Sequence, residues 1–84
     1  MHELKEQIRQ FLYGLLPDGR SLNLADNTPL RTSGIMDSME MLQLVSFLEE
    51  NFGIQVQSHE TGVENFDTIE SIAAFVQAKQ AKSN

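Results

Sequence analysis

The chain has 84 residues, with six Lys+Arg against twelve Asp+Glu, a formal net charge of -6 and no cysteine. This acidic balance leaves no electrostatic means of holding a phosphate backbone or an anionic membrane face, which excludes nucleic acid as a partner. The absence of cysteine excludes disulfides, thiolate metal clusters and a thiol nucleophile, and it suits a reducing compartment.

Length and the N-terminal sequence set further expectations. A chain this short suits a single domain, residues 1–84, with one small core at about residues 3–80 and a frayed tail at 81–84. The first residues carry no basic segment followed by an apolar run, and every apolar stretch is too short to span a bilayer. We therefore expect a cytoplasmic protein without a signal peptide and without membrane insertion.

The first predicted helix has hydrophobic residues at the i, i+4, i+7, i+8 and i+11 positions of one face. They are Leu4, Ile8, Phe11, Leu12 and Leu15. A Pro-Asp-Gly turn signature at residues 17–19 ends this helix, and a loop through Met36 follows. A loop of this length is uncommon in a compact domain, but its turn residues and spaced hydrophobic side chains predict that it lies across the core. Those side chains are Leu22, Leu24, Leu30 and Ile35.

The second predicted helix runs from Asp37 to about Phe52, and Gly53 is suited to end it. Its apolar face comprises Met41, Leu44, Val45, Leu48 and Phe52. Residues 58–60 predict a single short helical turn. A final helix is expected from an Asp67 N-cap to about Gln80, with an apolar face of Ile69, Ile72, Ala73 and Val76. Because residues 54–57 alternate like a strand but have no partner strand, the whole pattern indicates an all-α fold.

The sequence offers little for enzyme chemistry. His2 and His59 are far apart and lack metal-ligand spacing, and no glycine-rich phosphate loop or nucleophile elbow is present. We interpret His2 as an exposed terminal residue and His59 as a solvated loop residue, because a general base needs an oriented partner. The sequence therefore indicates no catalytic residue and no metal site.

The start of the second predicted helix is more informative. Asp37 and Glu40 have the spacing of a capping box, which puts Ser38 in the first turn. A hydroxyl at this position is exposed beside unsatisfied backbone N–H groups at the positive end of the helix dipole, where a phosphate is favoured. Serine and aspartate are also common helix caps, so this pattern alone leaves a plain capping role for Ser38 open.

Helical geometry places four residues opposite the apolar face of this helix, namely Met39, Gln43, Ser46 and Glu50. A flexible methionine beside Ser38 is typical of a surface that contacts several partners, although single exposed apolar residues are common. Phe47 falls beside the apolar stripe, and we expect it to pack against the preceding loop or the final helix.

These segments together resemble a known family. Residues 33–39 and 42–56 look like the Asp-Ser-Leu motif and recognition helix of acyl and peptidyl carrier proteins. Residues 64–69, with Ile72, Phe75 and Val76, resemble that family's final helix and its entry. The resemblance implies an acyl-carrier-like four-helix bundle with a long first loop and a short third helix. It also implies a non-catalytic carrier, in which 4′-phosphopantetheine from coenzyme A is attached to Ser38 and holds an acyl or aminoacyl cargo as a thioester.

The same resemblance implies roles for further residues and partners. Asp37 would support the attachment reaction, and a partner-binding surface would comprise Met39, Glu40, Ser46, Glu49 and Glu50. The implied partners are a phosphopantetheinyl transferase, a cargo-loading ligase or acyltransferase, and downstream acceptor enzymes. We expect a monomeric carrier that presents its tethered substrate to each partner at high effective concentration.

Several positions depart from the family pattern. Met39 replaces the usual Leu, Gln43 stands where fatty-acid carriers often have an acid, and Arg31 and Thr32 precede the motif. A Thr-Gly pair at residues 61–62 weakens the short third helix. These departures favour a stand-alone carrier in a specialised polyketide, nonribosomal peptide or aminoacyl pathway. The alternatives are a D-alanyl carrier for teichoic acid modification, a fatty-acid carrier and, from another class, an unmodified acidic helical adaptor in which Ser38 is a plain cap.

The acidic residues are concentrated in one part of the chain. Residues 32–78 hold eight of the twelve acids and no Lys or Arg. Since this segment contains Ser38 and the predicted recognition helix, we interpret its charge as a surface that steers basic patches of partner enzymes towards one serine. A purely solubilising role for the charge is the alternative.

Overall fold

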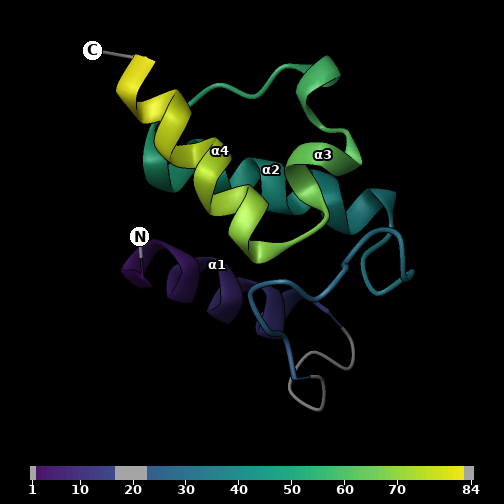
Figure 1. The fold of residues 1–84 in the computed structure, drawn as a ribbon. Helices are drawn as coiled ribbons and strands as arrows, with labels where there is room; N and C mark the ends of the chain where they lie inside the picture. Colours follow the sequence, from purple (N-terminus) through teal and green to yellow (C-terminus); the bar gives the residue numbers. More distant parts are fainter. Residues whose placement is uncertain (1, 17–22, 83–84) are drawn as a thin grey trace.

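The helices expected from the sequence form in the computed structural model, which describes residues 2–16 and 23–82 (Figure 1). Within these residues lie four α-helices, α1 (His2–Leu15), α2 (Ser38–Phe52), α3 (Val63–Phe66) and α4 (Ile69–Lys82). A 3₁₀ turn at Ser58–Glu60 precedes α3. The expected all-α class with a short third helix is confirmed, and no strand forms in the described part of the chain.

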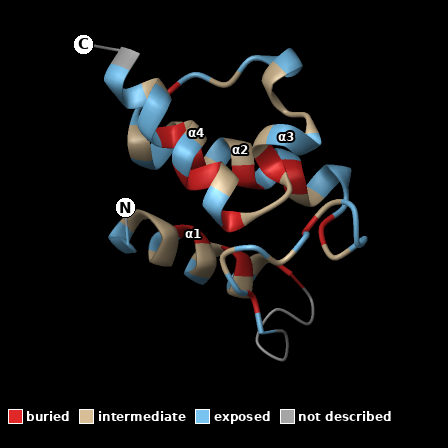
Figure 2. Ribbon diagram, in the orientation of Figure 1, coloured by how far each residue is buried: buried red, intermediate tan, exposed pale blue. Residues whose placement is uncertain are grey.

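The apolar faces of the three long helices meet in one core (Figure 2). Their buried residues all lie on the stripes predicted from the sequence, since burial of one face is what stabilises helices of this length. These residues are Ile8, Leu12, Met41, Leu44, Leu48, Ile69, Ile72, Ala73 and Val76. Phe66 of α3 is also fully buried, which joins the short helix to the same core.

The connection between α1 and α2 packs against this core where it is described. Leu24 and Leu30 are buried as expected, and Ile35 is partly buried against the same cluster. Met36, the residue before the cap of α2, is buried as well. The predicted turn at 17–19 and the Leu22 anchor lie outside the described residues.

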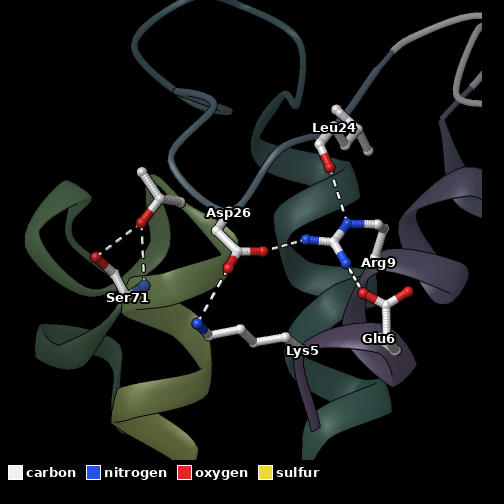
Figure 3. Close-up of polar contacts among 7 residues, drawn as sticks. Lys5, Glu6, Arg9, Leu24, Asp26 and Ser71 are labelled. Carbon is white, nitrogen blue, oxygen red and sulfur yellow. Dashed lines mark hydrogen bonds and ion pairs between the residues drawn. The ribbon is translucent and has the colours of Figure 1, made fainter. Parts of the chain in front are cut away.

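A polar cluster ties this connection to α1 (Figure 3), and a backbone hydrogen bond ties it to α4. Asp26 accepts a 3.0 Å hydrogen bond from Lys5 Nζ and pairs with the Arg9 guanidinium, which also donates to the Leu24 carbonyl at 2.8 Å. The backbone N–H of Glu70, in α4, donates to the Asp26 carbonyl at 3.0 Å. The hydrogen bonds from Lys5 and then from Arg9 lower the pKa of the Asp26 carboxyl below its ordinary value, so that this carboxylate stays ionised.

The start of α4 corrects one expectation. Asp67 does not cap this helix, because the Thr68 hydroxyl accepts the hydrogen bond from the Ser71 N–H at 3.0 Å and the helix begins at Ile69. Asp67 instead ends α3, where its N–H donates to the Val63 carbonyl at 3.1 Å. Residues 64–66 belong to α3, which leads into the final helix.

Two other expectations are refined by the packing. Phe47 packs against α1, a neighbour that the sequence did not suggest: its ring stacks on Phe11 with centroids 4.2 Å apart. The periodicity of a single helix shows that an aromatic residue lies beside the apolar face. It does not show which other element packs against that residue. The Thr-Gly pair at 61–62 divides the connector into two short pieces, the 3₁₀ turn and α3.

Candidate functional site

The candidate site is the first turn of α2, which begins with the predicted capping box. The Asp37 carboxylate accepts a hydrogen bond from the Glu40 N–H at 2.8 Å, and the Glu40 carboxylate accepts one from the Asp37 N–H at 3.0 Å. These two bonds satisfy backbone donors that every helix start leaves without an intrahelical partner. The predicted capping box is therefore confirmed, and it fixes where α2 starts.

Ser38 is the first helical residue and is exposed. Since the side chain of Asp37 provides the cap, the Ser38 hydroxyl is not needed to terminate the helix. The hydroxyl projects from the end of a 15-residue helix, where the dipole is positive and backbone N–H groups are close. This geometry suits a phosphate ester on an accessible side chain better than a buried reaction centre.

Exposed hydrophobic side chains lie near this serine. Met39 is 71% exposed, as the helical wheel predicted, and Leu42, one turn further along α2, is 60% exposed. On another helix, Val63, the first residue of α3, is 48% exposed. The sequence interpretation missed Leu42 and Val63. The same wheel places Leu42 within about 60° of Met39, so this residue was open to prediction, whereas Val63 required the position of α3.

The five residues expected on a partner surface differ in their surroundings. Met39, Ser46 and Glu50 are exposed. Glu40 is half-buried in the capping box, and Glu49 is half-buried with its carboxylate accepting a 2.9 Å hydrogen bond from the Val56 N–H. Glu40 and Glu49 therefore stabilise local backbone as well as contributing charge.

Several acids of the 32–78 segment are likewise bound internally. Asp67 accepts hydrogen bonds from the loop before α2, and Glu60 pairs with Lys79 at 2.7 Å and accepts from the Gln57 N–H at 2.8 Å. The hydrogen bond from Lys79 foremost, and then the one from Gln57, lowers the pKa of the Glu60 carboxyl below its ordinary value. The acids that remain exposed are Glu50, Glu64 and Glu70, together with Asp37 at the site itself.

Other kinds of site find little support among the described residues. His2 and His59 are both exposed. In the ranges 2–16 and 23–82, no group of three or more His, Cys, Asp or Glu side chains is placed to hold a metal ion. None of the helices in these ranges has the length and hydropathy that a membrane span requires.

Comparison with known proteins agrees with this geometry. The profile of the family described as "Phosphopantetheine attachment site" matches residues 3–76. The chain therefore belongs to the phosphopantetheine-binding family of carrier proteins. It is 34% identical over 64 residues to "Probable acyl carrier protein PigG" of Serratia sp. (strain ATCC 39006), a match that covers 76% of this chain and 74% of that protein. Members of the carrier family are not enzymes, so the chain is a non-catalytic carrier.

Proposed function

We propose that Ser38 is the residue that carries 4′-phosphopantetheine and that the protein holds its cargo as a thioester on this group. The observation that supports the proposal is the placement of Ser38 as the exposed first residue of α2, with the cap supplied by Asp37. The prosthetic group supplies the thiol that a chain without cysteine lacks.

In the attachment reaction, Ser38 Oγ forms a bond to the phosphorus of the pantetheine phosphate of coenzyme A. The pyrophosphate P–O bond breaks, 3′,5′-adenosine bisphosphate leaves, and the serine proton passes to a base. The phosphodiester at Ser38 keeps a negative charge, which the N-terminus of α2 stabilises. Asp37 holds a carboxylate beside the reacting hydroxyl, in a fixed position because the Glu40 N–H donates to it. From there it supports the transferase reaction by attracting the cation that neutralises the pyrophosphate.

We further propose that partners dock on the surface around this serine. Met39 and Leu42 provide exposed apolar area, and Glu50 provides negative charge on the same helix. Apolar contact at the centre with charge at the rim is the usual composition of a transient interface, in which the charge mainly accelerates association. The partners are a phosphopantetheinyl transferase, a cargo-loading ligase or acyltransferase, and acceptor enzymes with basic docking patches.

We also propose the type of pathway, the class of cargo and the cellular location. Gln43 and the Arg31–Thr32 pair depart from the fatty-acid carrier pattern, which favours a specialised biosynthetic pathway. The relative described as an acyl carrier protein supports an acyl cargo. We propose a monomeric carrier that acts in the cytoplasm, with a D-alanyl carrier and a fatty-acid carrier as the alternatives.

Intact-mass spectrometry tests the attachment residue directly. Purified protein incubated with a promiscuous phosphopantetheinyl transferase and coenzyme A is expected to gain the mass of one phosphopantetheine. Ser38→Ala is expected to gain none. Ser58→Ala, which alters another exposed serine at the start of a short helical turn, is the matched control and is expected to be modified like the wild type. Unmodified wild-type protein after treatment with several transferases would support the acidic adaptor instead. The cargo requires a separate measurement. Mass spectrometry of the protein isolated from its native cell gives the mass of the group that the thioester holds.

A further inference from the structure

Asp67 lies between α3 and α4, and it binds the loop that leads into Ser38. Its Oδ1 accepts hydrogen bonds from the Arg31 N–H at 2.9 Å and from the Thr32 N–H at 3.0 Å. The Thr32 hydroxyl donates to Oδ2 at 3.0 Å, and the Leu30 N–H donates to the Asp67 backbone carbonyl at 2.6 Å. One residue therefore accepts four hydrogen bonds from three consecutive residues of the loop.

The bound loop segment is itself closed just before the site. The Met36 N–H donates to the Leu30 carbonyl at 2.8 Å, and the Gly34 N–H donates to the Arg31 carbonyl at 3.1 Å. Leu30 and Met36 are both buried, so the two ends of this turn are held by the core. The cap residue Asp37 follows directly and Ser38 comes next, so a movement of this turn moves the first turn of α2.

The Asp67 side chain is well suited to hold the loop because it is ionised. The hydrogen bond from the Thr32 N–H foremost, and then that from the Arg31 N–H, lowers the pKa of the Asp67 carboxyl below its ordinary value. A charged acceptor forms stronger hydrogen bonds to backbone N–H groups than a neutral one. Asp67 is 35 residues from Thr32 in sequence, so the contact joins the loop to the far end of the chain.

We propose that Asp67 is a positioning residue for the modification of Ser38: by holding residues 30–32 it sets the place of the α2 N-terminus relative to α3 and α4. This inference rests on the proposed function, because it concerns the rate at which a transferase modifies that serine. Without the hydrogen bonds to Asp67, the loop samples arrangements in which Ser38 is displaced relative to α3 and α4. An interaction that requires the competent arrangement is weakened in proportion to the fraction of molecules that have it.

The test measures initial rates of phosphopantetheine attachment over a range of carrier concentrations, at a temperature where circular dichroism shows each variant folded. Asp67→Ala is expected to raise KM for the carrier roughly tenfold while kcat stays within about twofold, since the docked complex restores the arrangement. Asp67→Asn keeps an amide oxygen for the Arg31 and Thr32 N–H groups, so a smaller rise is expected. Glu70→Ala removes an exposed carboxylate three residues away and is the charge-matched control, with an unchanged KM.

Two further measurements separate positioning from stability. Thr32→Ala removes only the hydroxyl contact, remains informative if Asp67→Ala does not fold, and is expected to raise KM by about two- to threefold. Hydrogen exchange of the Arg31 and Thr32 amides is expected to accelerate in Asp67→Ala and to stay slow in Glu70→Ala. A lower unfolding midpoint with an unchanged KM in the Asp67 and Thr32 variants would overturn the inference and leave the proposed function intact. Failure of the wild-type protein to be modified would overturn both.

Discussion

The two connections that flank α2 are held in different ways. The one before it, residues 23–37, is anchored by buried Leu24, Leu30 and Met36 and by two carboxylates, Asp26 and Asp67, whose partners are distant in sequence. The one after it, residues 53–62, has one buried residue, Ile54, and several hydrogen bonds between near neighbours. Fixing a loop with distant contacts orders it relative to the whole bundle, and the better-anchored connection is the one that leads into Ser38.

The second connection illustrates the difference. Val56 donates its N–H to Glu49, seven residues away, and Gln57 donates its N–H to Glu60, three residues away. Its long-range ties are the ion pair of Glu60 with Lys79 of α4 and the hydrogen bond that the Arg31 guanidinium donates to the Thr61 carbonyl at 2.6 Å. We infer that this side of α2 tolerates change more readily than the side that carries the candidate site.

The largest expected effect comes from the apolar residues that anchor the two connections. Leu30→Ala should destabilise the protein by about 2–5 kcal/mol, because it leaves a cavity at a fully buried position. A change at a half-buried position of the second connection, Val56→Ala, should cost clearly less, since this side chain is smaller and buries less apolar area. Urea unfolding midpoints compare the two variants. Equal losses of stability would contradict the claim that the first connection is the more firmly held.

The second prediction concerns two adjacent acids of α2. Glu49→Lys should destabilise the protein by about 1–2 kcal/mol, because the Val56 N–H loses its charged acceptor. Glu50→Lys, the matched control at an exposed position, should change stability by no more than about 0.5 kcal/mol. Thermal unfolding measures both.

This difference matters for any partner assay. A loss of partner transfer in Glu50→Lys reports on docking charge, whereas a loss in Glu49→Lys mixes docking charge with stability. The resemblance to carrier proteins places both residues on the expected partner surface and does not distinguish them. If Glu49→Lys proves as stable as Glu50→Lys, the hydrogen bond to Val56 contributes nothing to the second connection.

The fold was predictable from sequence because it depends on local patterns. Three features depend on residues that are close together in the sequence. They are the apolar stripe of α1, the capping box of Asp37 and Glu40, and the buried face of α2. The resemblance to carrier proteins, carried by the segment around Ser38, then gave the family that the comparison with known proteins established.

What escaped prediction depends on contacts between distant residues. Asp67 has the residue type and position of a helix cap, but its carboxylate binds Arg31 and Thr32, whose location only the folded chain reveals. The stacking of Phe47 on Phe11 and the use of Glu49 as an acceptor for Val56 were missed for the same reason. Periodicity shows which face of a helix is buried, and the tertiary structure decides which partner covers it.

The smallest expected effect is the pH dependence of the two connections. Asp67 and Glu60 both have a pKa lowered by hydrogen bonds in the folded protein. Each carboxylate therefore contributes stability that is fully present above its unfolded pKa and is lost as the pH falls through its folded pKa. The ordinary values are 3.8 for Asp67 and 4.5 for Glu60, so the loss at Glu60 begins at the higher pH.

Unfolding midpoints measured from neutral pH down to about pH 3 should consequently fall less steeply in Glu60→Gln and in Asp67→Asn than in the wild type. As the pH is lowered, the unfolding midpoint of Glu60→Gln should depart from that of the wild type first. The midpoint of Asp67→Asn should depart from it at a lower pH. Glu64→Gln, which neutralises an exposed acid of α3, is the control and should follow the wild-type curve. If Asp67→Asn also follows the wild-type curve, the charge on the Asp67 carboxylate is not what holds the loop before Ser38.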